Sequence, residues 1–124
     1  MALTLETVLR DVLADAIDAE LNIGAGTSNM KLETTGDVEV ATIDFPNPAF
    51  GASSTGTITL LGVPLSDTSA TGGTVAQFSL YDRDGTKQLE GVVQVSGADL
   101  DLSSLSVGAT DTVELTSFSI TVPA

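Results

Sequence analysis

Near the start of the chain, apolar side chains recur at intervals of three and four residues, the spacing that places them on one face of an α-helix. The members of this stripe are Leu5, Val8, Leu9, Val12, Leu13, Ala16, Ile17 and Leu21. Asp11, Asp15 and Asp18 fall on the opposite side, and Glu6 can reach Arg10 one turn further on. The pattern predicts one amphipathic helix over residues 4–22.

The ends of this helix have recognisable signals. Thr4 is suited to an N-cap, and Gly24 is suited to a stop just beyond the last turn. Two interpretations of the apolar stripe stay open. The helix either lies with the stripe on the core of its own domain or docks the stripe on a neighbouring subunit.

Beyond Gly24 the helical period gives way to alternation, the pattern of half-buried strands. The clearest pair of strands surrounds Asp84-Gly85, a dipeptide suited to a two-residue type I′ turn because both positions tolerate positive φ. The apolar face of this pair consists of Ala76, Phe78 and Leu80 before the turn, and Leu89, Gly91, Val93 and Val95 after it. We expect a β-hairpin here.

Shorter alternating runs predict further strands between residues 30 and 123. The alternation changes phase near Val40 and again between Leu115 and Phe118, which predicts a bulge at each place. We therefore expect a single, mainly β domain over residues 1–124. Its predicted architecture is an antiparallel sandwich or barrel of about seven short strands with one N-terminal helix.

Residues 45–51 form a loop between two of these strands. Pro46 and Pro48 remove ladder donors, so the segment cannot be a central strand. We expect an ordered loop held in place by Phe45 and Phe50, which either cover the core or contact a partner.

The charge is strongly one-sided. Asp and Glu number 17, Lys and Arg only 4, and the net charge is −13. Such a chain repels a phosphate backbone, so direct binding of nucleic acid is not expected. No apolar run is long enough for a membrane span, and the first residues lack the basic and apolar segments of a secretory signal. We expect neither membrane insertion nor export.

The side chains also limit the chemistry. With no His and no Cys, the sequence cannot assemble a Ser-His-Asp or Cys-His nucleophile or a zinc site of the usual ligands. The carboxylate pairs Asp82 with Asp84 and Asp99 with Asp101 fall in a turn and on a solvent-facing edge. We expect no catalytic residues and no enzyme activity, and nothing indicates a nucleotide or another cofactor.

Calcium is the one ion that the acidic surplus keeps open. An EF-hand loop beginning at Asp82 would place Lys87 at the position of the required glycine and Val93 at that of the bidentate glutamate. This excludes an EF-hand. A weakly bound calcium ion between strand-connecting loops stays open, and no metal ligand is assigned.

Five segments, in order along the chain, resemble a group of small virion proteins of tailed bacteriophages. They are LETVLRDVL at residues 5–13, FPNPAFG at 45–51, AQFSLYDRDGT at 76–86, SGADLDL at 96–102 and VELTSFSITVP at 113–123. The resemblance implies a structural role in the particle, as a head decoration or cement protein on the outer capsid surface. It brings no catalytic residues.

The resemblance implies a protein made in the host cytoplasm that binds the assembled major capsid protein and stabilises contacts between capsomers. It would form a homo-oligomer on the capsid lattice, a trimer being one form. The candidate contact residues are Leu5, Val8, Leu9, Phe45, Pro46, Pro48 and Phe50. Two alternatives stay open: a tail tube or tail-completion subunit, and a secreted β-sandwich binding module.

Overall fold

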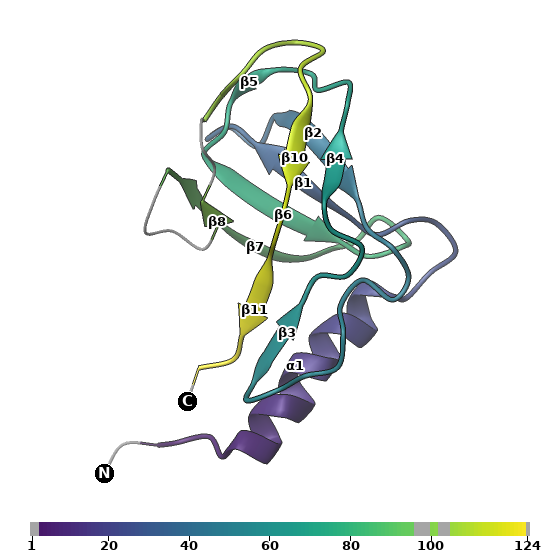
Figure 1. The fold of residues 1–124 in the computed structure, drawn as a ribbon, viewed down its shortest axis with the longest axis vertical. Coiled ribbons are helices and arrows are strands. Elements are labelled where there is room, and N and C mark those ends of the chain that lie inside the picture. The colour runs from purple at the N-terminus through teal and green to yellow at the C-terminus, as the bar shows by residue number, and fades with distance from the viewer. Residues whose placement is uncertain (1–2, 96–99, 102–104, 124) are drawn as a thin grey trace.

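The computed structural model describes residues 3–95, 100–101 and 105–123. Within these ranges the chain forms one helix and eleven short strands (Figure 1). The elements are α1 (Thr7–Leu21), β1 (Asn29–Glu33), β2 (Glu39–Asp44), β3 (Thr57–Thr59), β4 (Leu65–Asp67), β5 (Gly73–Thr74), β6 (Gln77–Tyr81), β7 (Lys87–Gln94), β8 (Leu100–Asp101), β9 (Ser106–Val107), β10 (Val113–Leu115) and β11 (Ser119–Thr121).

The main sheet has the strand order β2-β1-β6-β7-β8. All its neighbours are antiparallel except β7 and β8, which run parallel. Three two-stranded ribbons, β4 with β10, β3 with β11 and β5 with β9, complete a sandwich-like arrangement (Figure 1). The predicted mainly β fold with one N-terminal helix is confirmed.

The two predicted phase changes have different structural causes. Leu32 pairs with Ala41 and Glu33 with Glu39, so Val40 is the extra residue of a bulge, as predicted. The second phase change is not a bulge in one strand: β10 pairs with β4, and β11 pairs with β3. Phe118 lies between these strands with its side chain buried. This division, together with the short strands β4 and β5 between residues 65 and 74, brings the number of strands in the described residues above the seven expected.

The β6–β7 hairpin has the predicted partners, with Leu80 opposite Leu89, but a different turn. Gly85 has a φ of 84°, whereas Asp84 does not have positive φ, so the two-residue type I′ turn is wrong. Asp82 instead accepts the backbone N–H groups of Asp84 and Thr86 at 2.9 Å each, which closes a longer connection. The bond from Thr86 holds the pKa of Asp82 below its ordinary value.

The end of β7 differs from the prediction in one respect. Val95, assigned by alternation to the apolar face, is 62% exposed. Residues 96–99 and Leu102, which belong to a segment of the bacteriophage resemblance, lie outside the described residues.

The core contains all four phenylalanines, in a row of ring contacts. The ring centroids of Phe45 and Phe50 are 6.1 Å apart, those of Phe50 and Phe118 are 6.1 Å apart, and those of Phe118 and Phe78 are 5.4 Å apart. These contacts connect the 45–51 loop through the C-terminal strands to β6. The loop therefore covers the core, which was one of the two roles predicted for Phe45 and Phe50.

Candidate docking surface

Helix α1 lies across one end of the molecule, and no other described element covers its outer side (Figure 1). It starts later than predicted, at Thr7, with Glu6 at the N-cap position and no side-chain capping bond. Thr4 is therefore not the N-cap. Leu5, which precedes the helix, is partly buried against the core. In the described part of the chain no helix has both the length and the apolar composition needed to cross a membrane.

The polar side of α1 is attached to the domain rather than turned away from it. Three of its aspartates and the C-cap residue Asn22, at intervals of four, three and four residues, accept backbone N–H groups from the 49–56 loop. The bonds run from Gly56 N to Asp11 Oδ1 (2.7 Å), Ser53 N to Asp15 Oδ1 (2.9 Å), Phe50 N to Asp18 Oδ1 (2.9 Å) and Ala49 N to Asn22 Oδ1 (3.1 Å).

The helical period places the three aspartates away from the apolar stripe, but it does not predict their contacts with the 49–56 loop. These four N–H groups have no strand partner, and a donor left unpaired at a partly buried site is costly. A carboxylate is a strong acceptor for such a group. Asp11, Asp15, Asp18 and Asn22 therefore supply the hydrogen-bond acceptors for the loop. These bonds set the rotation of the helix about its axis.

Arg10 adds a further anchor on the same side of the molecule. Its Nε donates to the carbonyl oxygen of Val122 at 2.9 Å, beside the last strand. Gly56 lies under the guanidinium with a φ of 78°, and a Cβ there would come within 2.9 Å of it. The loop, the helix and the C-terminal segment are thus held together by polar contacts.

The opposite side of α1 carries an exposed apolar surface. Val8 is 78% exposed, Val12 59%, Leu9 46% and Leu13 40%, and Ala16 is also exposed. We call these five residues the α1 strip. Of the predicted apolar stripe, only Leu21 is fully buried, while Leu5 and Ile17 are partly buried.

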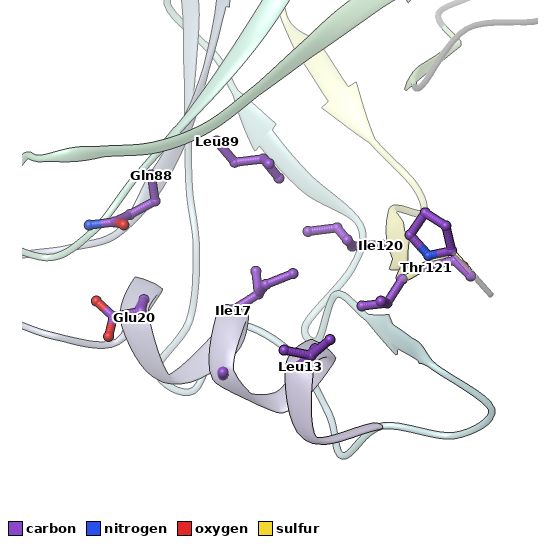
Figure 2. Close-up of a pocket in the computed structure, with 10 residues that line it drawn as sticks. Leu13, Ile17, Glu20, Gln88, Leu89, Ile120 and Thr121 are labelled. Carbon is purple, nitrogen blue, oxygen red and sulfur yellow. The ribbon is translucent and has the colours of Figure 1, made fainter. Parts of the chain in front are cut away.

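A groove continues from the strip onto the body of the domain. It has a volume of about 560 Å³ and lies between α1, β7 and β11 (Figure 2). Leu13, Ile17, Leu89 and Ile120 supply its apolar wall. We call it the α1 groove. Because Leu13 belongs to both, the strip and the groove form one continuous apolar surface.

The charges beside the strip are all negative. By their helical positions, exposed Asp15 borders it along one edge and exposed Glu20 lies at its C-terminal end, where it also lines the groove, and Glu6 precedes its first turn. Arg10, the only cation of the helix, is directed to Val122.

The other three cations of the chain have partners elsewhere. Lys31 lies over the Tyr81 ring, Arg83 donates to the carbonyl oxygen of Gly26, and Lys87 pairs with Glu90.

The structure separates the residues predicted as partner contacts into two groups. Val8 and Leu9 are exposed on the strip, whereas Leu5 is half-buried. In the loop, Phe45 and Phe50 are buried, so in this fold their side chains offer no surface to a partner. Pro46 is partly exposed and Pro48 exposed. The loop residues lie toward the C-terminal end of α1, where Ala49 meets Asn22, far from Val8.

Sequence reasoning missed Val12, Leu13 and Ala16 as contact candidates, together with the wall of the groove. A usable signal was present in the spacing of Asp11, Asp15, Asp18 and Asn22, which is the interval expected for residues facing a partner element.

No metal site emerges from the residues that the structure describes, because they contain no group of three or more Asp or Glu side chains placed to hold an ion. Both carboxylate oxygens of Asp82 are already engaged, Oδ1 by the turn and Oδ2 by Gln88 at 3.0 Å. Asp99 lies outside the described residues.

Comparisons with protein-family models, with curated proteins and with solved structures found no match to this chain. Any proposal about the function must therefore be argued from the sequence and the surfaces of the molecule.

Proposed function

We propose that this chain is a structural protein of a bacteriophage particle, attached to the outer surface of the capsid, where it stabilises contacts between capsomers. The observation that carries the proposal is the α1 strip, an apolar surface held outward on an otherwise acidic domain. Contiguous exposed apolar surface rimmed by polar residues is typical of a binding site for another protein.

The composition supports a structural role over a chemical one. The sequence has no His and no Cys. Its net charge of −13 favours solubility of a protein made in many copies, and keeps those copies apart until they reach the particle. The resemblance of five segments to bacteriophage virion proteins points to the same role.

Attachment would be multivalent. A homo-oligomer on a capsid lattice, a trimer for example, presents several copies of one modest surface to a repeating shell. Such contacts combine into an avidity that exceeds the affinity of any one of them. The major capsid protein is the partner that this proposal assigns.

The test is cryo-electron microscopy of particles that carry this protein, with the chain fitted to its density. Density repeated over the outer face of the head is the expected result. Density confined to the tail or its axis would contradict the proposal and favour a tail tube or tail-completion subunit. Absence of the protein from purified particles, checked by mass spectrometry, would favour a free binding module.

A further inference from the structure

We propose that the α1 strip and the α1 groove together dock an apolar ridge of a partner protein that is flanked by Lys and Arg side chains. The inference rests on the proposed function, since it places this basic and apolar ridge on the assembled capsid shell. It goes further by assigning the docking face and the chemistry of the partner.

The strip is exposed because the helix is held in one rotation. Four hydrogen bonds to the 49–56 loop and one from Arg10 to the C-terminal segment fix the polar side of α1 on the domain. Burying Val8 or Val12 within the same chain would require breaking these bonds. An apolar face held outward in this way can lose its exposure to water only by contact with another molecule.

The groove gives this face a place for an anchoring side chain. Its volume of about 560 Å³ exceeds that of any single side chain, and its wall is mainly aliphatic. Figure 2 shows Leu13, Ile17 and Ile120 directed toward the same hollow, with Glu20 and Gln88 at one end. A large apolar side chain entering here would make the kind of central, desolvated contact that dominates binding energy.

The charges decide which partner fits. Asp15, Glu20 and Glu6 lie at one edge and at the two ends of the strip, on a chain of net charge −13, and the helix's one cation, Arg10, is directed to the Val122 carbonyl oxygen. A second copy docked strip to strip would bring the same rim carboxylates, and like charges across that interface oppose association, so the proposed homo-oligomer would form through another surface. Lys and Arg beside an apolar ridge would complement the rim, so charge favours a basic partner over self-association.

The first arm of the test measures the strip. Capsid shells assembled without this protein are mixed with the full chain, and binding is followed by co-sedimentation. The double variant Val8→Ser/Val12→Ser is compared with Val38→Ser. Val38 is the control matched to Val12, because their side chains are 60% and 59% exposed and Val38 lies in the β1–β2 turn, away from the strip. We expect Val8→Ser/Val12→Ser to weaken binding at least tenfold, because the burial of a single valine side chain in an interface usually changes the affinity by about a factor of ten. Val38→Ser should bind like the wild type.

The second arm measures the charge. Glu20→Lys places a cation at the rim, and Glu114→Lys makes the same change on the exposed side of β10. We expect Glu20→Lys to weaken shell binding more than Glu114→Lys does, and the wild type to bind less tightly as salt is raised. Binding that is insensitive to salt and equal in the two variants would overturn the assignment of a basic partner.

The outcomes separate the two proposals. If the wild type does not bind shells, the proposed function fails and this inference fails with it. If the wild type binds but the double variant binds equally well, the function stands and the docking face is wrong. If light scattering shows that the isolated wild type is an oligomer and that Val8→Ser/Val12→Ser makes it monomeric, the strip is covered by a second copy and the basic partner is ruled out. Unchanged circular dichroism and melting curves confirm that each variant is folded.

Discussion

Helix α1 and the β6–β7 hairpin show opposite relations between apolar pattern and burial. In the hairpin the apolar face points inward, as alternation predicts: Phe78, Leu80 and Val93 are buried. In α1 the apolar strip points outward, and the carboxylates of Asp11 and Asp18 face the domain. A period identifies the type of element, but the side that is buried depends on what the neighbouring element requires. A sheet face needs apolar cover, whereas the 49–56 loop needs hydrogen-bond acceptors.

The largest loss of stability is expected from a substitution in the buried face of the hairpin. Leu80 is fully buried in β6, so Leu80→Ala removes apolar contacts and leaves a cavity. We expect a loss of about 2–5 kcal/mol in the free energy of unfolding, measured by urea denaturation. A loss below 1 kcal/mol would mean that the sheet face is not the centre of the core.

The next effect is on the polar side of α1. Asp18→Ala removes the acceptor of the Phe50 N–H, next to a buried ring. We expect unfolding to become easier by about 1–3 kcal/mol. Asp18→Asn keeps an oxygen acceptor and is the matched control, with a smaller loss. If neither variant lost measurable free energy of unfolding, the hydrogen bonds from the loop to the aspartates would not be what holds the helix.

The turn of the hairpin predicts a pH dependence. The pKa of Asp82 is lowered in the folded protein, mainly by the hydrogen bond from Thr86, so between the folded and unfolded pKa values the unfolded state binds more protons. The stabilisation by ionised Asp82 is therefore present above its unfolded pKa and is lost as the pH falls through the lower folded pKa. We expect the stability difference between wild type and Asp82→Ala to be largest near neutral pH and to shrink in acid. A difference independent of pH, in urea titrations at several pH values, would contradict this.

The smallest effect on stability is expected on the outer side of α1. Val12→Ser changes an exposed side chain, so the free energy of unfolding should move by about 0.5 kcal/mol or less. Thermal unfolding of the isolated chain checks this. A large loss would mean that the strip is covered within the free protein, and would remove the contrast between the two sides of the helix.

Several parts of the fold could be predicted because local signals determine them. The helix, the hairpin partners and the bulge at Val40 all follow from periodicity and its interruptions. The type I′ turn was a wrong prediction because Asp84-Gly85 is compatible with more than one turn type. The backbone N–H groups of Asp84 and Thr86, which donate to Asp82, favour the longer connection. Of the predicted contact residues, Val8 and Leu9 are exposed on the proposed docking face, whereas Phe45 and Phe50 are buried in the core.

By itself the sequence determined the mainly β class, the position of the single helix and the strongly negative charge, because periodicity and composition are local or additive properties. Only the tertiary structure decided which face of the helix meets the domain. That choice depends on a loop nearly thirty or more residues away, whose N–H groups at Ala49, Phe50, Ser53 and Gly56 need acceptors and find them on the polar side of α1 and at Asn22. The same long-range contacts placed Ile17 beside Leu89 and Ile120, and so created the groove.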